Sequence, residues 1–178
     1  FSNISKMIIT ASQLYKKILK YDNIVSKETI VKAYVLSKNA HANQYRGSGE
    51  EYFTHPLAVA DYLAEMKLDS STIITALLHD VVEDTKVTIQ NINDEFGIEI
   101  SRLVDGVNKL SKLDLKFGFA QAENFRKLLL ASSDDIRVLL FKLADRLHNI
   151  RTIDGIKNNE KKSKICFETL EIFAPLAE

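Results

Sequence analysis

An all-α fold, a compact multi-helix domain, is the class that this sequence predicts. Glycine and proline are scarce, at 6 and 2 of 178 residues. Apolar residues recur mostly three and four positions apart, the spacing that lines one face of a helix, and no segment has a convincing strand alternation. The length fits one domain with a sizeable core. We therefore expect a succession of helices joined by short loops.

The N-terminal part of the chain, up to the helix that contains Pro56, predicts three helices. Apolar spacing predicts one helix over about residues 4–20 and a second from Ser26 to about Gln44, followed by a polar loop. Thr54 is expected to cap a third helix. Pro56 then falls in its first turn, where a missing N–H costs nothing.

The segment TIITALLHDVVEDT is the most ambiguous, because its β-branched residues would also suit a buried strand. Its length and a capping Asp69 favour a helix. Thr88 begins a short helix that Gly97 ends, and another helix covers about residues 98–112.

The helical pattern weakens after this point. Residues 111–121 predict a mobile surface connection that could form a lid over a site. Ser133 opens the longest clear helix, to about Ile153, and a last helix runs from about Lys162 towards Pro175.

Composition excludes several classes of protein. The 24 basic residues balance 24 acidic ones, at a pI near 7.1, so no overall field favours nucleic acid or a membrane surface. Cys166 is the only cysteine, which excludes an internal disulfide, and we expect it to be a small buried residue. No apolar run approaches the roughly 20 residues that span a bilayer. A soluble, cytoplasmic protein is expected, with its oligomeric state left open.

Polar residues in segments expected to be buried indicate a metal-binding site. The apolar helix around residues 73–82 contains His79 and Asp80 side by side, and Asp145 lies among apolar positions of a second helix. Burying an unpaired charge is costly, and a divalent metal between these groups would offset the cost. A simple buried His–Asp pair is the structural alternative. Mixed imidazole and carboxylate ligands suit Mn²⁺, Fe²⁺ or Zn²⁺, of which we favour manganese.

Two further acids follow one turn later on the same faces. Glu83 and Asp84 stand four residues after His79 and Asp80 respectively. Beside a metal, such carboxylates can orient a water or take up its proton during attack on phosphorus. Taken alone, they would suit a solvated acidic helix end.

Several strings of the sequence carry a resemblance to a known family. They are YRGSGEEYFTHPLAVA, LLHDVVEDT, EFG, LVDGVNKLSKL, QAENFRKLLLA and DIRVLLFKLADRLHNIRTI. Together with the pattern of His55, His79–Asp80 and Asp145, they resemble the N-terminal hydrolase domain of bifunctional RelA/SpoT homologues, within the HD superfamily. The resemblance covers roughly residues 28–177, in order and with family-like spacing.

This resemblance implies a helical domain that hydrolyses (p)ppGpp to GDP or GTP plus pyrophosphate, with one bound manganese ion. It implies ten site residues: the metal ligands His55, His79, Asp80 and Asp145, the catalytic acids Glu83 and Asp84, a guanine-stacking Arg46, and nucleotide contacts from Ser48, Asn149 and Thr152. Helical spacing agrees with part of this set, because Asn149 and Thr152 share a face with Asp145.

The sequence also departs from the family pattern. Gly47 stands where many relatives have lysine, which removes a cation that could meet ligand phosphates, and Asn108 replaces a usual threonine. The ending ETLEIFAPLAE resembles the link into a synthetase domain that these residues do not include. We expect residues 1–178 to form one hydrolase domain, with an N-terminal helix within 1–25 and a C-terminal helix within 162–178, and no synthetase activity.

The remaining charged residues allow two interpretations each. His41 is expected to have a core or partly exposed role without ligation, and His148 either orients Asp145 or packs. A run of lysines near the C-terminus either attracts phosphates or forms a solvated surface. Its members are Lys157, Lys161, Lys162 and Lys164.

Three competing functions stay open at this point. An HD phosphohydrolase acting on a cyclic nucleotide or a deoxynucleoside triphosphate would use the same metal centre. A non-catalytic, nucleotide-binding regulatory module would need a lost or switched-off site, yet all the matching ligands are present. A purely structural helical domain would leave the buried His79, Asp80 and Asp145 without a reason.

Overall fold

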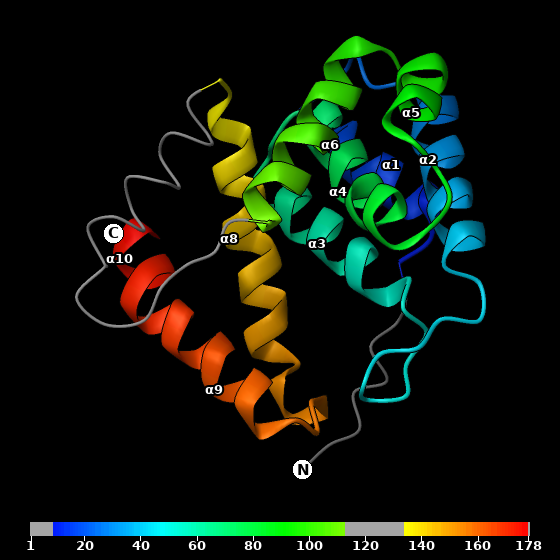
Figure 1. Cartoon of the computed structure of the whole chain (residues 1–178). Helices are drawn as coiled ribbons and strands as arrows, with labels where there is room; N and C mark the ends of the chain where they lie inside the picture. The colour runs from blue at the N-terminus through cyan, green and yellow to red at the C-terminus, as the bar shows by residue number, and fades with distance from the viewer. Residues whose placement is uncertain (1–8, 113–133, 178) are drawn as a thin grey trace.

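The computed structural model describes residues 9–112 and 134–177, and helices make up its regular structure there (Figure 1). The exception among these residues is an isolated bridge between Tyr45 and Glu51. The helices are α1 (Ala11–Ile18), α2 (Lys27–Ala40), α3 (Thr54–Glu65), α4 (Ser70–Asp84), α5 (Ile89–Phe96), α6 (Ile98–Ser111), α8 (Ile136–Arg151) and α9 (Asn159–Glu168). A 3₁₀ turn η1 (Ile153–Gly155), a π-helical turn η2 (Thr169–Phe173) and a short α10 (Ala174–Ala177) complete the described chain. The all-α prediction is confirmed.

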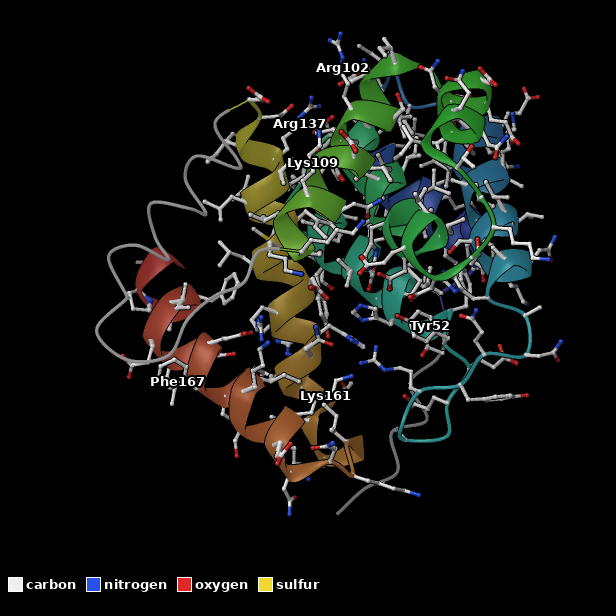
Figure 2. The ribbon with its side chains drawn as sticks, viewed as in Figure 1. Tyr52, Arg102, Lys109, Arg137, Lys161 and Phe167 are labelled. Carbon is white, nitrogen blue, oxygen red and sulfur yellow. The ribbon has the colours of Figure 1, made fainter. Side chains whose placement is uncertain are left out.

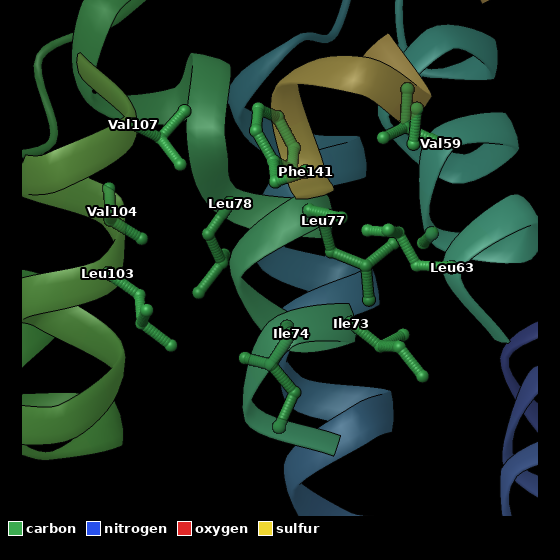
Figure 3. Packing of buried hydrophobic residues seen from close by; sticks show 14 of the residues in the cluster. Val59, Leu63, Ile73, Ile74, Leu77, Leu78, Leu103, Val104, Val107 and Phe141 are labelled. Carbon is green, nitrogen blue, oxygen red and sulfur yellow. The ribbon is translucent and has the colours of Figure 1, made fainter. Parts of the chain in front are cut away.

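Helix α4 lies at the centre of the core. Its apolar side chains point towards α2, α3, α6 and α8, and Ile73, Leu77 and Leu78 are fully buried among them (Figure 3). Being apolar nearly all round, this segment can satisfy its backbone polar groups internally as a helix while it buries every face. The choice of helix over strand for this segment is therefore confirmed.

Several predicted helix ends are confirmed by their caps. The Ser26 side chain accepts a hydrogen bond from the Thr29 amide at the start of α2. Thr88 and Asn91 form a reciprocal capping box on α5. Gly97 ends α5 with φ of 88°, a left-handed backbone that glycine adopts without a Cβ penalty.

Other predicted ends are wrong by a few residues. Helix α2 ends at Ala40, short of Gln44. Thr54 is the first residue of α3, where its hydroxyl donates to the Glu51 carbonyl, so Phe53 takes the cap position without a side-chain bond. Asp69 does occupy the cap position of α4. Its carboxylate accepts a hydrogen bond from the Thr72 hydroxyl and none from a backbone amide of the helix.

The first and last helices and the cysteine also differ from the predictions. Thr10 caps α1, so within the described residues the first helix starts later than expected. Asn158 caps α9, and the last helix therefore begins before Lys162. Cys166 is exposed, so the expectation of a buried thiol is wrong. The expected lid beyond Lys112, the start of the first helix within residues 4–8, and Ser133 lie outside the described residues.

Three helices carry the site, and their packing decides its position. Helices α3 and α4 pack against each other, and α8 packs against both. Helix α9 leaves the end of α8 through η1 and diverges from it, so it forms a separate wall (Figure 1). Within residues 9–112 and 134–177, no helix has the length and apolar character needed to cross a membrane.

A candidate metal and nucleotide site

Three of the four predicted metal ligands form a compact cluster. His55 comes from the first turn of α3, and His79 and Asp80 come from α4. Each offers a ligand atom, and these atoms lie within 4.8 Å of one another. Both histidines are buried at 5% exposure, and Asp80 is partly exposed. This arrangement can hold a divalent metal ion.

The hydrogen bonds of His79 test whether a cation fits this cluster. Its Nδ1 lies 2.8 Å from the Ala76 carbonyl oxygen, which can only accept, so Nδ1 carries a hydrogen. Its Nε2 lies 2.9 Å from Asp80 Oδ1. A neutral imidazole would present a lone pair to a carboxylate oxygen there. A proton on His79 or a metal ion held by both atoms would make this contact favourable, so the cluster can accommodate a cation.

The pKa values of the cluster agree with a site for positive charge. Burial acts to lower the pKa of His79, but the Asp80 carboxylate beside it raises the value above that of an ordinary histidine. Burial acts to raise the pKa of Asp80, yet His79 and His55 lower it to about 2. Asp80 is therefore a carboxylate at neutral pH and available as an anionic ligand.

The fourth predicted ligand lies beside the cluster. Asp145 Oδ1 is 3.1 Å from His55 Nε2 and accepts from Asn149 Nδ2 at 2.9 Å. Its other oxygen accepts from Lys142 Nζ at 2.9 Å. Burial acts against its charge, but Lys142 and His55 hold the pKa of Asp145 well below the usual carboxyl value. The prediction that a buried Asp145 needs partners is confirmed, although sequence reasoning missed Lys142.

His148 is placed against His55. Their Nδ1 atoms lie 2.8 Å apart, so one ring donates to the other, and the ring centroids are 4.8 Å apart. His148 is buried at 3% exposure. This contact fixes the orientation of a predicted ligand, His55, whereas the sequence-based alternatives were orientation of Asp145 or simple packing.

Tyr52 is a site residue that sequence reasoning missed. Its hydroxyl donates to Asp80 Oδ2 at 3.0 Å, and its ring stacks on His41 with centroids 4.9 Å apart. Burial, together with the charges of Asp80 and Asp84, raises the pKa of Tyr52, so it stays a donor. His41 is buried, as the core alternative predicted. The only sequence signal for Tyr52 was its place three residues before His55.

The predicted nucleotide-binding residues come together next to the metal cluster. Arg46 Nη2 lies 3.3 Å from Asn149 Oδ1 and 3.4 Å from Thr152 Oγ1, although the loop and helix are about a hundred residues apart. Ser48 follows Arg46 in the same loop. Glu83 and Asp84 are exposed at the end of α4. All ten predicted site residues line one cavity of about 600 Å³.

Comparison with known proteins places the chain in a family. The sequence model of the HD domain matches residues 33–178. The chain belongs to the HD domain family. Because that match spans most of the chain and includes all ten predicted site residues, the predicted superfamily is confirmed.

Relatives of this HD domain support the more specific resemblance. It is 52% identical over 166 residues to the GTP pyrophosphokinase rsh of Brucella ovis, and 50% identical over 167 residues to the bifunctional (p)ppGpp synthase/hydrolase SpoT of Escherichia coli. Each alignment covers 93% of the chain but only 22% and 23% of the relative. The HD domain therefore spans less than a quarter of the length of these proteins.

A solved structure shares the fold. It is described as a metazoan ortholog of SpoT that hydrolyses ppGpp and plays a role in starvation responses. The two structures superpose with a TM-score of 0.62 at 25% identity, over 79% of this HD domain and 80% of the other chain. The expected HD-type helical architecture is confirmed.

The structure gives a reason for Gly47 in this HD domain. A Cβ atom at Gly47 would lie 2.9 Å from the backbone oxygen of Gly155, and one at Gly155 would lie 2.7 Å from Ser48 Cβ. The loop that carries Arg46 thus rests directly on η1, with no room for a side chain between them. A lysine at position 47 would require the two backbones to separate.

The second departure, Asn108, lies in α6. It is buried at 7% exposure, and its Oδ1 has no hydrogen-bond partner within the part of the chain that the structure describes. An unpaired buried carbonyl costs roughly 1–3 kcal/mol. The described residues give no structural explanation for this substitution.

Proposed function

We propose that this HD domain is a manganese-dependent (p)ppGpp 3′-pyrophosphohydrolase, which forms GDP or GTP and pyrophosphate and so ends alarmone signalling in the stringent response. One observation carries the proposal. A single cavity contains both a buried His/Asp cluster and the group of Arg46, Asn149 and Thr152. The relatives named as ppGpp hydrolases support the choice of substrate. We infer further that residues 1–178 act as one hydrolase domain.

His55, His79, Asp80 and Asp145 would hold the metal. Two imidazoles and two carboxylates form a donor set that suits Mn²⁺ among the divalent ions. A metal bound there lowers the pKa of a coordinated water and stabilises negative charge on a phosphoryl group. Tyr52 and His148 would keep Asp80 and His55 in position, through the contacts described above.

The other residues would bind the nucleotide and move the proton. Arg46 would stack on guanine, with Ser48, Asn149 and Thr152 as polar contacts. Glu83 or Asp84 would orient a water and accept its proton as the water oxygen bonds to the 3′-linked phosphorus. The bond between that phosphorus and the ribose 3′ oxygen would break, and the proton taken from the water would pass to this oxygen. The products are then pyrophosphate and the 3′-hydroxyl of GDP.

The direct test is product formation by the manganese-loaded chain with ppGpp, followed as GDP and pyrophosphate. We expect both products in equal amounts, and neither in a chelated sample. Cyclic GMP and dGTP under the same conditions test the alternative of a different HD phosphohydrolase. A chain that binds manganese and ppGpp without turnover would fit the regulatory alternative, and the proposal would be wrong.

Tyr52→Phe should weaken metal binding while the fold is retained. The change removes the hydrogen bond to Asp80 and keeps the ring that stacks on His41. Loss of such an orienting contact typically costs about 10- to 100-fold in metal affinity or activity. Titration of Mn²⁺ into the apo protein measures the effect. Tyr34→Phe, which loses a hydrogen bond to the Ile9 carbonyl away from the cavity, is the control and should bind manganese normally.

Gly47→Lys should raise the KM for ppGpp, although the resemblance to the RelA/SpoT family implies a lysine at this position. Its Cβ collides with the Gly155 carbonyl, so the loop with Arg46 must move away from Asn149 and Thr152. We expect an increase of about tenfold, equal to about 1.4 kcal/mol of binding. Gly47→Ala adds the same Cβ without the ammonium group and should show a similar increase. A KM below that of the parent for Gly47→Lys would contradict this account.

A further inference from the structure

The proposed substrate has two anionic arms, and the site described so far provides for only one of them. The 3′-diphosphate would lie at the metal cluster, and guanine at Arg46. The 5′-phosphates must then occupy another part of the same cavity. The following inference rests on the proposed function and concerns where that second arm binds.

Helix α9 forms one wall of the cavity, opposite the end of α4. Its lining residues are Lys161, Lys164, Ile165 and Glu168. These positions are separated by three, one and three residues, the spacing of a single helical face. Lys161 lies near the start of α9, where this helix leaves the end of α8 (Figure 2). One face of α9 is therefore turned towards the nucleotide site, and it carries two lysines.

The charges around the cavity show which cations are available to a ligand. Lys142 is engaged by Asp145, and Arg146 by Glu168 at 2.7 Å. Lys161 forms no ion pair with any residue in 9–112 or 134–177. Lys164 Nζ is 3.9 Å from Glu168, whose charge is already shared with Arg146. On the α9 wall, the described part of the chain thus leaves two ammonium groups largely uncompensated.

Buried contacts hold this wall in place. The Arg146–Glu168 ion pair is almost fully buried, at 11% and 10% side-chain exposure. The Arg146 guanidinium also lies over the Phe173 ring, 4.5 Å from its centroid. These contacts join α9 and η2 to α8, the helix that carries Asp145 and Asn149. Helix α9, which carries Lys161 and Lys164, is therefore anchored to the helix that carries the predicted metal and nucleotide residues Asp145 and Asn149.

We propose that Lys161 and Lys164 form a second phosphate subsite, which binds the 5′-di- or triphosphate of the guanine nucleotide. The opposite rim supports this direction, because Glu83 and Asp84 would repel a second anionic arm at the end of α4. An ammonium pair binds phosphate oxygens through charge-assisted hydrogen bonds. The remaining lysines of this run, Lys157 and Lys162, do not line the cavity and serve as internal controls.

The test compares substrates with and without 5′-phosphates. The double variant Lys161→Ala/Lys164→Ala is loaded with manganese and assayed with ppGpp, pppGpp and guanosine 3′-diphosphate. We expect KM to rise about tenfold or more for ppGpp and pppGpp, with kcat within about twofold of the parent. For guanosine 3′-diphosphate, which lacks the 5′ arm, KM should not change. The matched control Lys157→Ala/Lys162→Ala removes the same charge and should behave like the parent.

In this kinetic comparison, two outcomes would overturn the subsite. One is an equal rise in KM for guanosine 3′-diphosphate, which would indicate a general effect on the site. The other is an equal rise in the control variant, which would indicate only the overall field of the helix.

Equilibrium binding separates this inference from the proposed function. Absence of turnover by the parent with any of the three substrates would reject the hydrolase. The subsite can still be tested then, because the parent should bind GDP more tightly than guanosine, and the Lys161→Ala/Lys164→Ala variant should lose that difference. Equal binding of GDP and guanosine by the parent would overturn the subsite.

Discussion

Asp80→Asn should lower kcat for ppGpp hydrolysis by about 10³-fold or more, or about 4 kcal/mol of transition-state stabilisation. The reason is the position of Asp80 in the cluster. One of its oxygens is 2.9 Å from His79 Nε2, and the other accepts from Tyr52 and lies 3.9 Å from His55 Nε2. The amide keeps the shape but loses the negative charge that binds a cation. Product release and bound manganese are measured on the same sample.

The control for this prediction is Asp94→Asn. Asp94 is an exposed aspartate on α5, a helix that contributes no residue to the cavity wall. This variant should retain full activity and full metal content. Thermal unfolding of both variants would be measured to check that they are folded. An Asp80→Asn protein that turns over ppGpp at the parental rate would remove Asp80 from the proposed metal site.

Glu83→Gln and Asp84→Asn should separate catalysis from metal binding. Both acids lie at the exposed end of α4, in the lining of the cavity but outside the buried His55–His79–Asp80 cluster. If either moves the proton of the attacking water, its amide variant should lose about 10²- to 10⁴-fold in kcat. Manganese content and KM should stay close to those of the parent. Steady-state kinetics combined with metal analysis measure all three quantities.

Glu95→Gln is the matched control, since Glu95 is an exposed glutamate on α5. It should leave kcat unchanged. Loss of manganese from the Glu83→Gln or Asp84→Asn protein would make that acid a support of the metal and not a proton acceptor. Parental kcat in both variants would reject the acid pair as catalytic residues and leave the proposed mechanism without its base.

The sequence by itself determined that the chain is helical, where several helices begin or end, and that polar residues such as His79 are buried. Capping by Ser26 and Thr88 and the turn at Gly97 are local signals, read from residues that bond within one turn. Burial of His79 also followed from local sequence, because the residues around it are apolar on every face. The ten site residues were expected from the resemblance, and the structure places them around one cavity. Their roles stay predictions until the variants are measured.

Only the tertiary structure decided which polar groups meet across helices. Examples are His55 against His148, Arg146 against Glu168, and the backbone of Gly47 against that of Gly155. Periodicity and capping report on neighbours within a turn of the chain, whereas these contacts depend on how α3, α8 and α9 pack. A side chain's partner is set by that packing and by the need to satisfy each buried charge or hydrogen-bonding atom. For this reason the sequence could predict ten residues that surround one cavity, but not the contacts that orient them.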